Sequence, residues 1–285
     1  MGNILLSAAI LLSGGLFSTF YLFASLLNFA FIGKSTFYEL QHRILWPVID
    51  KAWHDHVGVV QMLAQGRALR LCGDARCDSP GYSATYGTYT LMVMLDGLIC
   101  GFSFVQVTET DHNSGAMEKE GLRRLLLQLR RDGLNVSLLA TDRSPQIRAM
   151  MRREFPTIKH RFDIWHFAKS VTKKLHKSSK KKDYATLRQW IPAVETHLWW
   201  SASNCNRDPK VLREKWTSVV HPITDKHTWT GNEVFHQCEH GVLPDADQIA
   251  WLDSAGAEAE TLQKIVFDKQ LLDDVGKLSQ FLSRG

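Results

Sequence analysis

The sequence is poor in cysteine and has no internal repeats or low-complexity tracts. Its 285 residues include five cysteines at irregular intervals. An odd number of cysteines without regular spacing argues against a secreted scaffold held by disulfides and favours a reducing compartment. Hydrophobic residues make up 45% of the chain and charged residues 22%. This composition is globular and excludes a disordered chain.

Charged residues are absent from the first 33 positions. The stretch from Ile4 to Ile32 is rich in Leu, Ile, Phe and Ala, and its length and apolarity make it a candidate membrane span. No Lys or Arg precedes it, so it is a poor match to a signal peptide. The N-terminal myristoylation pattern also fails, because Leu6 stands where that pattern needs Ser or Thr.

A second interpretation of the same stretch is a pair of shorter, buried helices. Polar residues and glycines divide it, with Gly14 and Gly15 near its centre. Helices over Ile4–Leu12 and Ser18–Phe31, separated by this glycine pair, explain the pattern equally well. The sequence therefore leaves two alternatives open for residues 4–32, a membrane anchor or a helical region.

The rest of the chain predicts a mixed order of strands and helices. Helix-like spacing of apolar residues covers residues 36–67, 116–131, 145–155 and 166–177, and strand-like patterns cover 69–74, 89–95, 99–107, 136–142 and 158–164. An Asp96-Gly97 turn between two apolar runs indicates a hairpin. This order is typical of an α/β fold.

We expect four regions along the chain. They are a helical N-terminal region (1–66), an α/β core (67–180), a helical insertion rich in Trp, His and Cys (181–256), and a last helix that returns to the core (257–285). We expect this last helix to run from Ala257 to Phe281 with a break at Gly276. Four tryptophans of the insertion are expected to form its core rather than to stack on bases: Trp190, Trp199, Trp200 and Trp216.

Two aspartates each end an apolar strand of the predicted core. They are Asp74, after residues 69–73, and Asp142, after residues 136–141. Neighbouring strands can bring two such residues within a few ångströms of each other at the edge of a sheet. Carboxylate oxygens are the ligands that Mg²⁺ and Mn²⁺ prefer, and a pair of such ions suits phosphodiester cleavage. The alternative is that both aspartates only cap turns or following helices.

Five motifs resemble, in the same order, those of one transposase family. They are Gly73–Gly81, Tyr86–Met92, Ala116–Leu122, Thr141–Arg143 and Phe162–His166. In this order they are similar to motifs of Kolobok-type DNA transposases, and the resemblance spans nearly the whole chain. It implies a ribonuclease H-like α/β core, with a mixed sheet, flanking helices and an all-helical insertion. It also implies metal-dependent cleavage and transfer of DNA strands.

The resemblance implies roles for individual residues as well. Asp74 matches the first carboxylate of an acidic catalytic triad, and Asp142 matches the second. Asp163 and His166 match an acidic-x-x-His signature that follows the second carboxylate in several transposase superfamilies. Two interpretations of His166 stay open: it fixes the start of a helix, or it acts near the scissile phosphate and the metal ligands.

The third carboxylate of the family, a Glu, is expected after the helical insertion. In the family it lies past a stretch like Phe281–Gly285, at which this sequence stops. Glu258 and Glu260 follow the insertion but lie outside the expected motif. Because a two-metal site that lacks one ligand should be severely impaired, the resemblance leaves three alternatives open. The chain is a fragment of the enzyme, a degraded copy of it or the product of a partial gene model.

A run of lysines follows the acidic-x-x-His signature. Between positions 169 and 182 there are seven lysines and no acidic residue. Lysines beside an active site can neutralise DNA phosphates without reading base sequence; the alternative is a solvated helix face. The predicted nucleic-acid-binding residues are Lys169, Lys173, Lys174, Lys177, Lys180, Lys181 and Lys182.

The insertion also holds candidate zinc ligands. Four Cys and His side chains suit a tetrahedral structural site. The expected set is His197, Cys205, Cys238 and His240. The competing histidines are His221, His227 and His236. The alternative is a set of ordinary buried cysteines and surface histidines.

The sequence and the resemblance together predict a transposase-derived protein of the nucleus that uses Mg²⁺ or Mn²⁺. DNA is the expected partner, self-association is left open, and no small-molecule substrate is indicated. Two other functions remain as alternatives. One is a DNA-binding or interaction protein that has lost the chemistry, and the other is a protein anchored in a membrane through residues 4–32.

Overall fold

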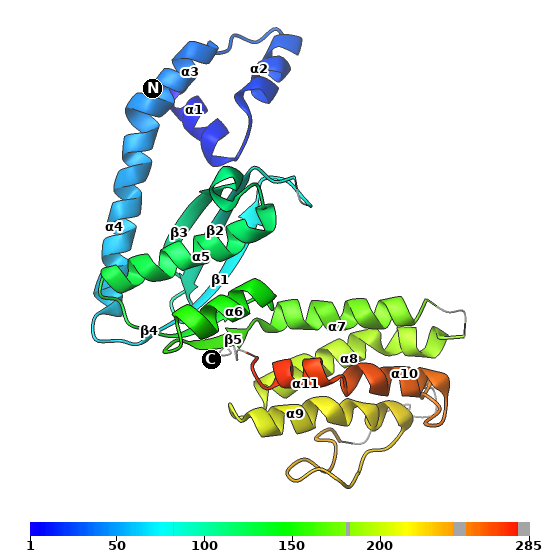
Figure 1. Cartoon of the computed structure of the whole chain (residues 1–285). Helices are drawn as coiled ribbons and strands as arrows, with labels where there is room; N and C mark the ends of the chain where they lie inside the picture. The colour runs from blue at the N-terminus through cyan, green and yellow to red at the C-terminus, as the bar shows by residue number, and fades with distance from the viewer. Residues whose placement is uncertain (82, 181–182, 242–248, 279–285) are drawn as a thin grey trace. The chain divides into compact units, whose positions relative to one another are not determined.

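The computed structural model describes residues 1–81, 83–180, 183–241 and 249–278, and the chain divides into two compact units, 1–65 and 66–285. The first unit is helical (Figure 1). It contains α1 (Gly2–Leu12), α2 (Phe17–Leu26), α3 (Lys34–Leu40) and α4 (Trp46–Ala64), with a π-helical turn, η1 (Gln41–Leu45), between α3 and α4.

Glycines separate the first two helices. Gly14 has φ of +70°, a left-handed conformation that favours glycine, and a Cβ on Gly15 would lie 2.4 Å from the ring of Phe20. The stretch therefore breaks into two short helices, as the second interpretation of residues 4–32 predicted, although α2 ends at Leu26 and not at Phe31. The expected burial of these helices was wrong, because most of their apolar side chains are partly or fully exposed; the buried residues are Ser7, Ile10, Phe17 and Ala24. No helix among the described residues has the length and apolarity needed to cross a membrane.

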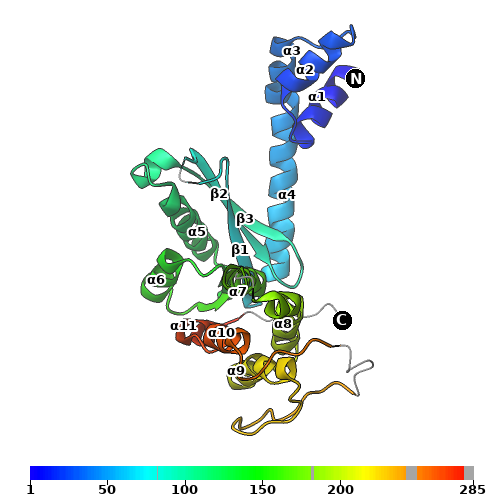
Figure 2. The same cartoon turned by 90° about the vertical axis from the view of Figure 1, so that its right-hand side faces the viewer.

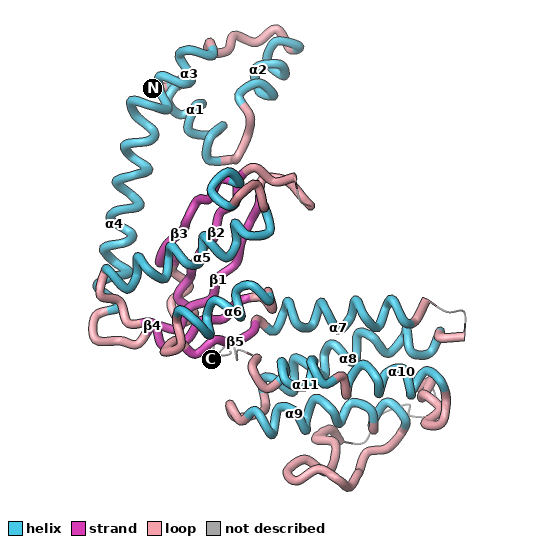
Figure 3. The backbone as a smooth tube through the Cα atoms, in the orientation of Figure 1, coloured by secondary structure: helices cyan, strands magenta, loops and turns pink. Residues whose placement is uncertain are grey.

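The second unit is built on a five-stranded mixed sheet. Its strands are β1 (Leu69–Cys77), β2 (Tyr86–Val93), β3 (Ile99–Gln106), β4 (Val136–Thr141) and β5 (Lys159–Phe162), in the spatial order β3-β2-β1-β4-β5. The pairs β3–β2 and β2–β1 are antiparallel, whereas β1–β4 and β4–β5 are parallel. Figure 3 shows the strands together in magenta. The predicted α/β class is thus confirmed.

Helix α5 (Ser114–Arg131) packs across β2 and β3 (Figures 1 and 2). Its leucine stripe is buried as predicted, at Leu122, Leu125, Leu126 and Leu129. Gly121 lets the helix approach the sheet closely, because a Cβ there would lie only 2.9 Å from Cβ of Tyr89. A short 3₁₀ helix, η2 (Val107–Thr110), precedes α5, and α6 (Pro145–Glu154) follows β4.

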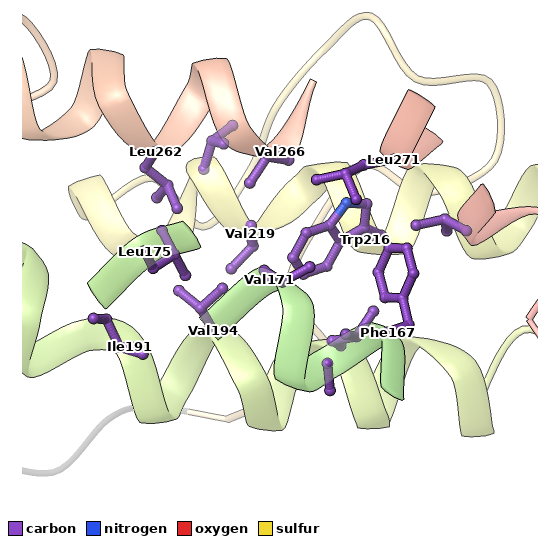
Figure 4. Close-up of a cluster of buried hydrophobic side chains, with 14 of the residues drawn as sticks. Phe167, Val171, Leu175, Ile191, Val194, Trp216, Val219, Leu262, Val266 and Leu271 are labelled. Atoms are coloured by element: carbon purple, nitrogen blue, oxygen red, sulfur yellow. The ribbon is translucent and has the colours of Figure 1, made fainter. Parts of the chain in front are cut away.

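Five further helices form a bundle around one hydrophobic core. They are α7 (Ile164–Ser178), α8 (Ala185–Ser203), α9 (Pro209–Thr217), α10 (Ala257–Val266) and α11 (Lys269–Val275); the 3₁₀ helices η3 (Ser218–Val220) and η4 (Pro222–Thr224) follow α9. Figure 4 shows Phe167, Val171 and Trp216 at the centre of this core. Trp216 is fully buried, and Trp190 and Trp199 pack against the same core. Helix α7 thus belongs to the packing of the bundle.

A helix does end at Gly276, where a break was expected, but the expectation of one continuous helix from residue 257 to that glycine was wrong. The break falls at Phe267 and Asp268, where the Asp268 carboxylate caps α11 by accepting a hydrogen bond from the backbone N–H of Leu271 (2.9 Å). Gly276 is the C-cap of α11. A local capping bond therefore decided the boundary. Residues 279–281 lie outside the described part of the chain.

A buried carboxylate connects α6 and the turn before it to the bundle. The Asp274 side chain is 1% exposed and accepts hydrogen bonds from Arg143 (3.2 Å) and Arg148 (3.1 Å). Next to it, Phe162 of β5 forms a parallel bridge with Leu278. Because a buried charge is tolerated only when it is paired and hydrogen-bonded, we interpret this cluster as structural.

Gly121→Ala is expected to destabilise the protein. Alanine favours a helix over glycine by about 1 kcal/mol, but overpacking against Tyr89 costs about 1–3 kcal/mol, and we expect the overpacking to dominate. The control is Gly58→Ala in α4, where nothing lies within 4 Å of the added Cβ, so that only the gain in helix propensity remains. Urea unfolding measures whether each substitution raises or lowers the free energy of unfolding. Equal stabilisation by both substitutions would contradict the close approach of α5.

Candidate functional site

Asp74 and Asp142 lie at the same level of two neighbouring parallel strands. In the β1–β4 pair, Cys72 is opposite Ala140, and each aspartate follows two residues later. Asp74 is still within β1, whereas Asp142 is the first residue after β4. Since side chains two residues apart share one face of a strand, the pairing directs both carboxylates to the same region. The structure therefore brings together the two aspartates that the sequence singled out.

Asp163 and His166 lie at the beginning of α7, beside these aspartates. The backbone N–H of Asp163 donates to the carbonyl of Thr141 (2.7 Å), which holds the end of β5 against the end of β4. The Asp163 carboxylate caps α7 by accepting a hydrogen bond from the backbone N–H of His166 (3.0 Å). The Nε2 atom of His166 lies 4.0 Å from Oδ2 of Asp74. His166 is thus next to the first aspartate, and Asp163 has the capping role.

A third carboxylate, Glu118 of α5, belongs to this group. Burial, and then the negative charges of Asp142 and Asp74, raise the pKa of Glu118 to about 7. An acidic pair that shifts the pKa of a half-buried third acid is a frequent property of functional sites. The sequence alone assigned no role to Glu118, although it lies within the Ala116–Leu122 motif. Glu118 is three residues before Gly121, and the close helix–sheet approach at that glycine holds it near the strand ends.

The buried ring of Tyr89 lies beneath the carboxylates. Its hydroxyl has no hydrogen-bond partner among the described residues. Burial, followed by the charges of Glu118, Asp142 and Asp74, raises the pKa of Tyr89 well above its ordinary value. Gly73 makes room for this ring, because a Cβ at that position would lie 2.7 Å from Cε1 of Tyr89. The residue before Asp74 is therefore constrained by packing.

These carboxylates offer oxygen ligands but are not gathered around one point. Among the described residues, the ligand atoms of Asp74, Asp142 and Glu118 do not all lie within 4.8 Å of one another. A site for two ions about 4 Å apart does not require that, since different carboxylates bind different ions. The donor chemistry, three carboxylates with hard oxygen atoms, fits Mg²⁺ or Mn²⁺.

The predicted basic face lies on α7, directly after His166. The described lysines of the run are exposed: Lys169, Lys173, Lys174, Lys177 and Lys180. The opposite face of the helix is buried, with Phe167 and Val171 in the bundle core. At the start of the helix, Nζ of Lys169 lies 4.6 Å from the ring centroid of Trp165, which is itself half exposed. Lys181 and Lys182 lie outside the described residues.

Glu258 and Glu260 have other partners in the bundle. Oε1 of Glu258 accepts a hydrogen bond from the backbone N–H of Leu187 in α8 (2.9 Å). Glu260 forms an ion pair with Lys264 within α10 (2.6 Å). Neither carboxylate contributes to the pKa shift of Glu118.

The four expected zinc ligands do not form one group among the described residues. Cys238 and His240 lie together, and the residue that joins them is His227, one of the competing histidines. The buried thiol of Cys205 donates to the carbonyl of Ala202 (3.3 Å). His197 makes a 2.6 Å hydrogen bond through Nε2 to the carbonyl of Lys215. The described structure therefore groups two of the four expected ligands with a third that the sequence offered only as a competitor.

No family model matches the chain, and no curated protein is similar to it at a significant level. The interpretation of the site therefore depends on its geometry and on the resemblance of the five motifs.

Glu118→Gln is expected to flatten the pH dependence of stability. With a pKa raised from 4.5 to about 7, Glu118 binds its proton more tightly in the folded than in the unfolded state. The free energy of unfolding therefore falls as pH rises through that window. The free energy of unfolding of the variant is compared with that of the wild type, both without divalent ions. Between pH 4.5 and pH 8 this difference should shift in favour of the variant by on the order of 1–3 kcal/mol.

Urea unfolding in EDTA at several pH values measures this difference. Glu120→Gln is the control, because Glu120 lies on the same helix but pairs with Arg124 (2.8 Å). If Glu118→Gln follows the wild-type pH profile, Glu118 is not in the electrostatic environment described above.

Proposed function

We propose that residues 66–285 form a ribonuclease H-like unit derived from a DNA transposase, whose chemistry is metal-dependent cleavage and transfer of DNA strands. The strand order, with an antiparallel β3-β2-β1 meander followed by the parallel strands β4 and β5, agrees with that fold. The bundle of α7 to α11 agrees with a helical insertion, although α7 was expected to belong to the α/β core. The motif resemblance supplies the transposase assignment.

The observation that carries this proposal is the group of three acids at one end of the sheet. Asp74 and Asp142 come from adjacent parallel strands, and Glu118 comes from the helix that packs on the sheet. The charges of Asp74 and Asp142 make ionisation of the half-buried Glu118 unfavourable when no cation is bound. Such an arrangement therefore suits residues that hold divalent ions.

Each residue then has a role that follows from its position. Asp74, Asp142 and Glu118 would hold the ions through carboxylate oxygens, and bound divalent ions would activate the attacking hydroxyl and stabilise the leaving oxygen of the phosphodiester. The attacking hydroxyl would come from water or from a DNA 3′ end. His166, 4.0 Å from Asp74, would orient that carboxylate or contact the scissile phosphate. Asp163 would keep His166 in place through its cap of α7.

The exposed lysines of α7 would hold the DNA backbone. They extend along one face of the helix from the acidic group, and lysine contacts to phosphate fix position without base specificity. The half-exposed Trp165 adds an aromatic surface at the same end of the helix. A protein that acts on chromosomal DNA would work in the nucleus.

A second candidate function is DNA binding without catalysis. The specific observation in its favour is that the three carboxylates do not converge within 4.8 Å. In addition, Asp142 accepts a hydrogen bond from the backbone N–H of Ser144 (2.9 Å), and Asp163 caps α7, which are structural roles. The lysine face would serve this function equally well.

A nicking assay on supercoiled plasmid separates the two functions. We expect wild-type protein to nick DNA with Mg²⁺ or Mn²⁺, and we expect Asp142→Asn and Glu118→Gln to reduce nicking to the metal-free background, because each removes an anionic ligand. Glu120→Gln serves as the matched control on α5 and should keep the activity. Absent cleavage, or cleavage unchanged in Asp142→Asn, leaves only the DNA-binding function.

Substitution of the lysines tests DNA binding independently of catalysis. Lys173→Ala and Lys177→Ala should each weaken binding to duplexes of any sequence. Each should also make the negative slope of log K against log salt shallower by about 1, as expected when one phosphate contact is lost. Lys264→Ala is the control, since Lys264 is exposed on α10 and paired with Glu260. Fluorescence anisotropy at several salt concentrations measures the slope for each variant and for the wild type. Equal slopes for all three variants would contradict the assignment of α7.

A further inference from the structure

The described residues between η4 and α10 have little regular structure of their own. The described residues between Thr224 and Ala257 form no helix, and one antiparallel bridge joins Thr228 to Gln237. Long connections of this kind in a compact unit are usually functional or fixed by additional interactions.

Backbone hydrogen bonds bring two short stretches of the segment side by side. The N–H of Cys238 donates to the carbonyl of His227 (3.0 Å), and the N–H of Trp229 donates to the carbonyl of His236 (2.8 Å). The turn that connects them is held by Glu214 of α9, whose carboxylate accepts hydrogen bonds from three consecutive backbone N–H groups, those of residues 233–235. His227 and Cys238 are thus neighbours although eleven positions separate them.

His240 completes a group of three metal-ligating side chains. The ligand atoms of His227, Cys238 and His240 all lie within 4.8 Å of one another. The rings of His227 and His240 meet edge to face, with centroids 5.0 Å apart. Since zinc ligands lie about 2.0–2.3 Å from the ion, small side-chain rotations are enough for these three atoms to share one ion.

Hydrogen bonding leaves one nitrogen of each imidazole available. Nδ1 of His240 donates to the carbonyl of Gly241 (2.7 Å), which leaves Nε2 as the metal-binding atom. Nε2 of His227 lies 3.4 Å from the Asp225 carboxylate, whereas Nδ1 of His227 is buried and has no hydrogen-bond partner among the described residues. A carboxylate or carbonyl on the second nitrogen is the usual arrangement around a histidine that binds zinc.

We infer that His227, Cys238 and His240 form a zinc-binding site, with Asp225 as the carboxylate that orients His227. Two imidazoles and a thiolate suit zinc and exclude Mg²⁺, Ca²⁺ and Mn²⁺, which prefer oxygen. The site is therefore chemically distinct from the carboxylate group on the sheet. The ion fixes the segment between η4 and α10 by linking its two paired stretches to His240.

The fourth position of a tetrahedral ion remains for water or a further ligand. All three side chains line one cavity of about 770 Å³, whose other walls include Trp190, Trp229 and Trp251. The indole N–H of Trp190 donates to the carbonyl of Ala250 (2.8 Å) and its ring stacks on Trp251. The proposed zinc ion thus lies at the wall of an aromatic cavity.

Metal analysis of the full-length protein tests the inference. Protein purified without added metal is expected to contain about one zinc ion per chain. Replacement of zinc by Co²⁺ should produce a thiolate-to-cobalt charge-transfer band in the near ultraviolet, and Cys238→Ser should abolish that band. Asp225→Asn keeps all three ligands and should lower zinc affinity roughly tenfold to a hundredfold. Zinc chelation should lower Tm.

His236→Ala and Cys77→Ser are the matched controls, since His236 is an exposed histidine of the same segment and Cys77 is an exposed cysteine of β1. Both should keep full zinc content. The Co²⁺ spectrum of the wild-type protein gives a result even if a ligand variant fails to fold. Folded wild-type protein that binds no zinc, a cobalt complex without the thiolate band, or equal loss of zinc in His236→Ala would overturn the assignment.

Discussion

The parallel pairing of β1 with β4 is the constraint on which the candidate site on the sheet depends. It joins strands separated by more than fifty residues and aligns Cys72 with Ala140, so that Asp74 and Asp142 follow at one level. The antiparallel side of β1 adds a packing condition, because the ring of Tyr89 on β2 requires a glycine at position 73. Helix α5 then approaches Cβ of the same tyrosine at Gly121 and brings Glu118 near the two aspartates. A shift of β1 by one residue would move Asp74 to the other face.

Two buried or half-buried acids of the same unit show how environment separates structural from functional carboxylates. Asp274 is almost fully buried, but two arginines and Gln270 donate to it, so its charge is balanced and the cluster joins α6 to α11. Glu118 instead has two other carboxylates as its electrostatic neighbours, and its pKa rises to about 7. A protein gains no stability from like charges that lie near one another. The proximity of these three carboxylates therefore favours a role in binding cations.

The two proposed metal sites of this unit have opposite chemical character. The carboxylates at the sheet provide hard oxygen ligands, which suit ions that exchange water and act on phosphates. The bundle side provides imidazole and thiolate, which suit a zinc ion. The first arises from strand ends and a helix face, and the second from a single bridge between stretches that lack other regular structure. Their ligand chemistry allows the loss of one ion to be followed separately from the loss of the other.

The sequence by itself determined the features that depend on neighbours close in the chain. The leucine stripe of α5, the turn at Asp96 and Gly97, the apolar strand that ends before Asp142, and the glycine break in the first apolar stretch all follow from local spacing and backbone preference, and all are present in the structure. The strand that was expected to end at Asp74 continues to Cys77, because its pairing with β2 extends past the aspartate. The division of residues 257–278 into α10 and α11 was missed, because a single capping aspartate, Asp268, decides it.

Only the tertiary structure decided which side chains meet. Glu118 stands on a helix among several charged residues, and nothing in its spacing separates it from Glu120; the approach of α5 to the sheet at Gly121 selects it. His227 was one of several histidines in its region, and a backbone bridge between residues 228 and 237 pairs it with Cys238 in place of the expected His197 and Cys205. Local patterns reflect short-range sterics and hydrogen bonds, whereas these selections arise from pairings across long loops, whose register depends on the packing of the whole unit.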